Sequence, residues 1–118
     1  MAATVNSLMF RTVSGRPFSV SSYNAANGAV GTYLPVDMNQ VAVSTSPTNF
    51  IIPERCYLVD YIAGAATGTV ELISNGKSTS IMIDYATRGA TNSGRQPLNI
   101  PLEVGTQVMF KVIGVLPA

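Results

Sequence analysis

Hydrophobic and polar residues alternate with a period of two along much of the chain, most clearly over residues 70–85. The dipeptide Asn75-Gly76 separates two alternating runs in this region. Asn-Gly favours a type I′ turn, because both central residues of that turn need φ > 0, and it therefore predicts a β-hairpin. A two-residue loop also sets the register, so the expected facing pairs are Ile73 with Ser78, Leu72 with Thr79, Glu71 with Ser80 and Val70 with Ile81.

The predicted hairpin has two unlike faces, because successive side chains of a strand point to opposite sides. We expect one face to line a hydrophobic core and the other to be partly exposed to solvent. The core face carries Val70, Leu72, Thr79, Ile81, Ile83 and Tyr85, and the other carries Thr69, Glu71, Ile73, Ser78, Ser80, Met82 and Asp84.

Short strand-like runs recur along the rest of the chain, separated by turns rich in Gly, Pro and Asn. They cover residues 18–23, 30–34, 40–44, 50–52, 56–63, 98–102 and 107–113. No helix of ordinary length is indicated. About seven to nine strands at a spacing of roughly 8–12 residues predict an all-β fold, either an antiparallel β-sandwich, a jelly roll or a small barrel.

The run over 56–63 is the most apolar and is predicted to lie inside a sheet, because both of its sides look covered. Perfect alternation would place Tyr57, Val59 and Tyr61 on one side and Leu58, Asp60 and Ile62 on the other. In the last run Val108, Phe110 and Val112 are expected to face inward. Pro97 and Pro101 lack the N–H that a ladder needs, so 97–102 is predicted to be an edge strand.

Residues 1–16 show no sustained period, and we interpret them as an N-terminal arm or edge strand beside a sandwich domain over 17–118. A chain of 118 residues is long enough for one independent core. No run is long and apolar enough to span a membrane. The first residues lack the features of a secretory signal, so the chain acts where it is made or has lost a signal.

The surface is unusually poor in charge. Only 11% of the residues are charged, the net charge is +1, and 47% of the residues are hydrophobic. Ordinary soluble domains have about 25% charged residues, whereas buried protein–protein contacts are depleted in charge. The composition therefore favours a subunit of a larger assembly. Because phosphate binding needs clustered Lys and Arg, it also argues against nucleic acid as a partner.

The sequence offers little for catalysis. It has no histidine and one cysteine, which excludes Ser-His and Cys-His triads and an ordinary zinc site. Cys56 is expected to be a buried hydrophobic residue. A carboxylate pair could serve a glycosidase, but no spacing brings two carboxylates together. We therefore expect no enzyme, no cofactor and no metal site, with a calcium ion shared between subunits left open.

Two groups of residues could take part in binding. Arg88 and Arg95 flank a polar loop over 86–96 that we expect to be mobile and able to contact an acidic neighbour. The five tyrosines could stack on sugars, although core and interface packing is the alternative. They are Tyr23, Tyr33, Tyr57, Tyr61 and Tyr85.

In its composition and strand pattern the chain resembles small virion proteins built on a β-sandwich or jelly roll, such as bacteriophage capsid decoration (cement) proteins and minor capsid proteins. The resemblance lies in the N-terminal arm, the low-charge body rich in Ser, Thr, Asn, Gly and Ala, and the closing edge–turn–strand segment over 97–112. It implies a structural protein on the capsid surface, assembled in the host cytoplasm. Its partners would be major capsid or other virion proteins and its own copies, with a trimer among the options.

Under this interpretation the interface residues would come from both ends of the chain, two tyrosines and the polar loop. They are Leu8, Met9, Phe10, Tyr57, Tyr61, Arg88, Arg95, Val115 and Leu116. Deleting residues 1–14 would then leave a folded domain that no longer associates. The competing interpretation is a carbohydrate- or receptor-binding sandwich, as in a fibre tip or lectin-like module, which would use the tyrosines and the Arg88–Arg95 loop.

Overall fold

The computed structural model describes residues 4–24, 28–36 and 50–116, so the strand expected over 40–44 lies outside the described residues. The described part forms nine strands and one short 3-10 turn, η1 (Tyr85–Thr87). The strands are β1 (Thr4–Thr12), β2 (Pro17–Asn24), β3 (Tyr33–Leu34), β4 (Phe50–Ile51), β5 (Cys56–Ile62), β6 (Thr69–Ser74), β7 (Lys77–Asp84), β8 (Ile100–Leu102) and β9 (Gln107–Gly114).

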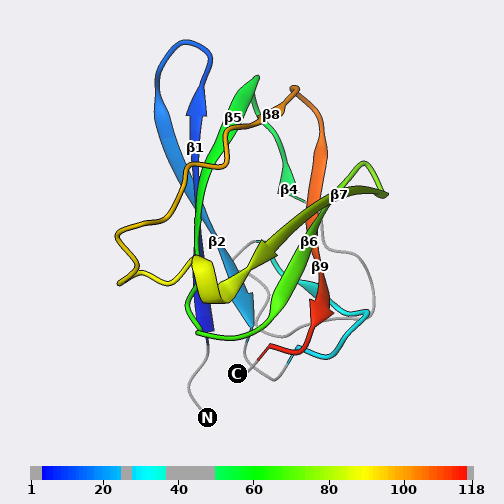
Figure 1. Ribbon diagram of the computed structural model, residues 1–118. Helices are drawn as coiled ribbons and strands as arrows, with labels where there is room; N and C mark the ends of the chain where they lie inside the picture. The colour runs from blue at the N-terminus through cyan, green and yellow to red at the C-terminus, as the bar shows by residue number, and fades with distance from the viewer. Residues whose placement is uncertain (1–3, 25–27, 37–49, 117–118) are drawn as a thin grey trace.

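The strands form two antiparallel sheets that pack as a β-sandwich, which confirms the predicted fold class (Figure 1). One sheet has the order β2-β1-β5-β8. The other has the order β3-β9-β6-β7, and β4 also pairs with β9. The core between the sheets is built from inward residues of both, including Leu8, Leu58, Leu72 and Phe110.

The β6–β7 hairpin follows the predicted register only near its turn. Ile73 faces Ser78 as expected, but farther along Glu71 faces Met82 and Val70 faces Ile83. The strand β7 therefore holds two extra residues, so the register predicted for Glu71 and Val70 is wrong. Because the shift is by two residues, Val70, Leu72, Ile83 and Tyr85 stay on the core face, and all four are buried. The other face is not partly exposed throughout, as predicted, because Glu71 and Ile73 are only 8% and 6% exposed.

The side chain of Glu71 explains this shift. It is only 8% exposed and accepts hydrogen bonds from the Ser78 hydroxyl and, at 3.2 Å, from the Ser80 N–H. Ser80 adopts φ = 59°, a left-handed conformation that is costly for a residue with a Cβ. The irregular part of β7 thus supplies donors to a carboxylate that would otherwise be buried without partners.

The strand β1 is central, not peripheral. It pairs with β2 on one side and with β5 on the other. Leu8 is fully buried and Phe10 is 2% exposed, and the Phe10 ring stacks on Phe18 with a centroid separation of 4.8 Å. The interpretation of residues 1–16 as an arm or edge strand is therefore wrong for the whole of β1.

A β-bulge in β5 changes the predicted alternation. Met9 faces Asp60 but Phe10 faces Leu58, so Val59 is an extra residue on β5. Beyond the bulge the two sides exchange, and Tyr57 is 41% exposed while Tyr61 is fully buried. The prediction that Tyr57 and Tyr61 share one side is wrong, because one inserted residue reverses all positions that follow it.

Other local predictions are confirmed. The strand β8 lies at a sheet edge with Pro101 opposite Tyr57, and Val108, Phe110 and Val112 of β9 are fully buried. Cys56 is 1% exposed, and burial, with the nearby Glu54 charge, raises the pKa of its thiol. None of the described residues forms a helix that could cross a membrane.

Candidate functional site

Three loops meet at one end of the sandwich, at the top of Figure 1, and form the candidate site. They are the β1–β2 turn (13–16), the segment 51–55 and the β8–β9 turn (103–106), together called the hairpin end. The middle segment joins the other two: the Val13 N–H donates to the Arg55 carbonyl at 3.1 Å, and the Ile52 N–H donates to the Thr106 carbonyl at 2.9 Å. The loops are therefore held in one arrangement.

The β1–β2 turn is compact because of its glycine. The Thr12 N–H donates to the Arg16 carbonyl at 2.8 Å, and the Gly15 N–H donates to the Thr12 carbonyl at 2.9 Å. Gly15 has φ = 98°, as expected for the left-handed position of a three-residue hairpin loop. The Arg16 N–H also donates to the Thr12 hydroxyl at 2.9 Å, which fixes where the Arg16 side chain leaves the turn.

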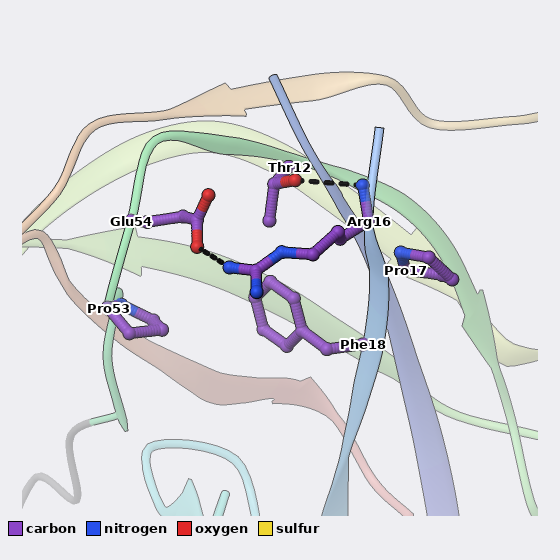
Figure 2. A pocket seen from close by; sticks show the side chains of 6 residues that line it. All are labelled: Thr12, Arg16, Pro17, Phe18, Pro53 and Glu54. Carbon is purple, nitrogen blue, oxygen red and sulfur yellow. Dashed lines mark hydrogen bonds and ion pairs between the residues drawn. The ribbon is translucent and has the colours of Figure 1, made fainter. Parts of the chain in front are cut away.

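A hollow of about 430 Å³ opens between this turn and the 51–55 segment, and most of its lining is apolar. Figure 2 shows Arg16 extending across it toward Glu54, with the Phe18 ring and two prolines around them. The lining residues are Thr12, Arg16, Pro17, Phe18, Pro53 and Glu54.

The aromatic part of the hollow is rigid. The Phe18 ring lies nearly parallel to the Phe10 ring, at an interplanar angle of 8°, and Phe10 contacts Phe50 at a centroid separation of 5.9 Å. Proline rings add apolar surface with little conformational freedom to lose. These walls present aromatic and proline rings to an apolar side chain.

Each of the three loops of the hairpin end carries an exposed apolar side chain. Val13, Ile51 and Val104 are 58%, 59% and 64% exposed, one from each of the three loops. The nearby charges are paired but exposed: Arg16 bonds to Glu54, and Arg55 lies 3.4 Å from Glu103. Exposed ion pairs contribute little stability, so a partner can exchange them at small cost. The hairpin end therefore combines exposed apolar side chains with exposed, paired charges.

Histidine and clustered metal ligands are not found at the described hairpin end. The chain contains no histidine, and within the described residues no three Cys, Asp or Glu side chains lie together as metal ligands would. The nearest hydroxyl, Thr12, is engaged with the Arg16 N–H and the Ser14 hydroxyl. The arrangement at the hairpin end offers apolar surface and exposed ion pairs.

Arg88 and Arg95 do not form the predicted contact loop. Arg88 is 6% exposed, and its guanidinium donates to the Tyr61 carbonyl at 3.1 Å, to the Gln96 carbonyl at 2.6 Å and to the Asp60 carboxylate. The prediction that Arg88 contacts a neighbouring molecule is wrong, because its donors are used within its own chain.

Arg95 completes this cluster. Its Nε and Nη2 lie 3.2 and 3.1 Å from the other carboxylate oxygen of Asp60, and its Nη1 donates to the Gly89 carbonyl at 3.1 Å. One carboxylate thus binds two guanidinium groups, and together they hold the loop over 88–96 against β5. Their role is structural, although a fifth of the Arg95 side chain remains exposed.

The other predicted interface residues divide between core and surface. Leu8, Phe10, Tyr61 and Leu116 are at most 2% exposed, so their assignment as interface anchors is wrong; they build the domain itself. Met9 and Tyr57 are 43% and 41% exposed, and Val115 is 63% exposed. The last three remain predicted contact residues, but they lie outside the hairpin end.

Two of the tyrosines proposed for sugar stacking are inside the core. The hydroxyl groups of Tyr61 and Tyr85 lie 2.8 Å apart, and both residues are fully buried. Burial raises the pKa of each well above its ordinary value. Neither ring can stack on a sugar, which removes two members of the predicted platform.

The residues that line the hollow are not predicted by the local sequence pattern. Gly15-Arg16-Pro17 and Pro53-Glu54-Arg55 have the composition of ordinary turns between strands. The signal that was present is the pair of opposite charges beside prolines in two loops. Adjacency of those loops follows from β1 lying next to β5, which the local pattern does not reveal.

In the comparison with known proteins, no family model, no curated protein and no solved structure matches this chain.

Proposed function

We propose that this protein is a structural virion subunit, of the capsid decoration or minor capsid class, that attaches to neighbouring shell proteins through its hairpin end. The observation that carries the proposal is the set of three exposed apolar side chains in loops at the same end of the sandwich as a mainly apolar hollow. Exposed apolar side chains suit contact with protein better than contact with water alone, and the charges at this end are already paired with each other.

The proposed attachment works by repeated weak contacts. A partner side chain fills the hollow beside Phe18, while Val13, Ile51 and Val104 are covered by the surrounding surface. Many subunits on one shell then add their contacts, because each bound subunit holds the next site close by. The carbohydrate-binding alternative has less support, since Tyr61 and Tyr85 are buried and Arg88 bonds within its own chain.

The first test is the composition of virus particles. Particles purified from the virus that encodes this chain should contain it in a fixed ratio to the major shell protein, measured by quantitative mass spectrometry. Its absence from such particles would overturn the proposal.

The second test locates the contact. Purified chain is added back to particles from which it has been stripped, and bound protein is measured by co-sedimentation. The double variant Val13→Glu, Ile51→Glu should bind at least about tenfold more weakly, because charge would be buried in the contact. Val30→Glu is the matched control, since Val30 is 61% exposed and belongs to the segment 28–36, cyan in Figure 1, which lies near the opposite end of the sandwich. Equal loss in both variants would contradict attachment at the hairpin end.

A further inference from the structure

The free edge of β2 presents a regular row of main-chain hydrogen-bonding groups. The bond from the Thr12 N–H to the Arg16 carbonyl sets the phase of the β1–β2 ladder. Hydrogen-bonded pairs then recur every second residue, at Phe10–Phe18, Leu8–Val20 and Asn6–Ser22. The N–H and C=O groups of Ser19, Ser21 and Tyr23 consequently point away from β1, toward the edge of the sheet.

Nothing in the described part of the chain uses this edge. Beyond the ladder with β1, no main-chain hydrogen bond of the described residues involves Ser19 or Ser21. The register from Arg11–Pro17 to Thr4–Asn24 is continuous, so β2 contains no bulge. Pro17 occupies its first position, and none of its eight residues is charged.

The other sheet edges of the described chain are short or irregular. The strands β3 and β4 have two residues each, and β8 has three, of which Pro101 is one. The longer edge strand β7 carries Lys77 and Asp84 and is distorted at Ser80, with φ = 59°. Bulges, prolines and charges are the devices by which proteins prevent edge strands from pairing with other chains. The strand β2 has none of them beyond its first residue.

We infer that the β2 edge is the surface by which this subunit pairs with a second copy of itself, β2 against β2 in antiparallel orientation. The inference deepens the proposed function and rests on it, since it names the contact between neighbouring subunits. An uncharged strand suits a copy of itself, because the two-fold arrangement places no like charges opposite each other. The two four-stranded sheets would join into one continuous sheet.

The expected register follows from the groups that point outward. A two-fold axis beside Ser21 places Ser21 opposite Ser21 of the second copy, and Ser19 opposite its Tyr23. All the outward N–H groups then find acceptors, with about six main-chain hydrogen bonds across the axis. Ser19 is exposed and Ser21 is half-buried, so both can accept a partner strand without unfolding of the sandwich.

A charge exchange at Ser21 tests this register. We expect the wild-type chain to sediment as a dimer that dissociates on dilution, and Ser21→Lys and Ser21→Glu each to dimerise at least about fivefold more weakly, since like charges meet at the axis. An equimolar mixture of the two variants should dimerise again, as a heterodimer. Met82→Lys and Met82→Glu on β7 are the matched controls, because Met82 is 52% exposed and should leave the dimer unchanged.

A second variant keeps the test decisive if a charge at position 21 disturbs folding. Facing residues of a hydrogen-bonded antiparallel pair have Cα atoms about 5.5 Å apart, within the range of a disulfide. Ser21→Cys should therefore form a disulfide-linked dimer in air, while Met82→Cys should not. The native Cys56 is 1% exposed and does not compete.

A wild-type chain that stays monomeric, variants at Ser21 that dimerise like wild type, or loss of the dimer in the Met82 variants would each overturn this interface. A wild-type chain that is monomeric but still binds to particles refutes the β2 contact alone. A stable dimer of a chain that is absent from particles refutes the proposed virion function alone.

Discussion

The two long hairpins of this sandwich, β1–β2 and β6–β7, differ in how far their turns determine their pairing. In β1–β2 a three-residue loop is followed by one unbroken register over the full length of both strands. In β6–β7 a tighter two-residue loop fixes only the pairs Ser74–Lys77 and Ile73–Ser78 before the register shifts. The difference shows that a turn sets the residue pairs next to it, whereas the burial of side chains determines the pairs farther along the hairpin.

The same difference controls what each edge can do. The buried carboxylate of Glu71 draws the Ser78 hydroxyl and the Ser80 N–H toward it, and β7 becomes irregular. No charged side chain lies in β2, so its edge stays regular and open to a partner. One hairpin is therefore closed to further pairing and the other is available for it.

The largest effect is expected from removing β1. Deletion of residues 1–14 takes away a strand that is paired on both sides, and the loss should exceed the whole stability of a small domain, about 5–15 kcal/mol. Circular dichroism should show no cooperative thermal transition. A deletion variant that still unfolds cooperatively would show that β1 is a dispensable arm. It would contradict the central position of β1 in its sheet.

The next largest difference is expected between a buried residue of β1 and an exposed residue of β7. Phe10→Ala removes a ring that is 2% exposed and stacked on Phe18, which should cost about 3–5 kcal/mol. Met82→Ala on the open face of β7 should stay within about 0.5 kcal/mol. Urea denaturation measures both, and equal losses would contradict the burial that distinguishes these positions.

The tyrosine pair connects the two sheets, with Tyr61 on β5 and Tyr85 directly after β7. Burial raises the pKa of both above the ordinary value of 10.0. Above pH 10 the unfolded chain loses these protons while the folded chain keeps them, so stability is fully present below pH 10 and falls as pH rises further.

The expected slope is on the order of 1.4 kcal/mol per pH unit for each tyrosine. It should be visible in urea denaturation between pH 10 and 11.5 and reduced in the double variant Tyr61→Phe, Tyr85→Phe. The Cys56 thiol, whose pKa is also raised, lowers stability at high pH in the wild-type chain and in the double variant alike. A slope unchanged by the double variant would contradict burial of the pair.

A smaller loss should follow from removing the carboxylate that distorts β7. Glu71→Ala removes the carboxylate that accepts hydrogen bonds from the Ser78 hydroxyl and from the Ser80 N–H, which should cost about 1–3 kcal/mol. The control Glu103→Ala removes a carboxylate that is 70% exposed and should change little. If Glu71→Ala is as stable as the control, the carboxylate does not hold the shifted register.

The smallest effect is a gain at Ser80. Its φ of 59° suits glycine better than serine, so Ser80→Gly should stabilise the protein by up to about 1 kcal/mol. Ser78→Gly on the same strand should instead destabilise it, because it removes the hydroxyl that bonds to Glu71. A loss of stability in both variants would show that Ser80 is not strained.

Much of the fold could be predicted because the signals are local. Asn75-Gly76 fixed the position of a hairpin, alternation placed Val108, Phe110 and Val112 inward, and Pro101 marked an edge. The register beyond Ile73 could not be predicted, because it depends on how Glu71 is solvated after folding. The bulge at Val59 could not be predicted either, because an inserted residue does not change the pattern of a run that is apolar on both sides.

The candidate site was less accessible to sequence analysis than the fold. Met9 and Phe10 are neighbours in one apolar run, yet only Met9 reaches the surface, because the run belongs to a central strand. Arg88 looks like a loop arginine until Asp60, 28 positions away, is brought beside it. Contacts between residues distant in sequence decide which polar groups remain for a partner, and these contacts exist only once the sheets are assembled.

The most direct test of the open β2 edge is amide hydrogen exchange of the intact chain, followed residue by residue by NMR at low and high protein concentration. The account predicts that the N–H groups of Ser19, Ser21 and Tyr23 exchange fast when dilute and become protected when concentrated, while those of Met82 and Asp84 on β7 do not change. Outward amides of β2 that stay equally fast at every concentration would contradict it.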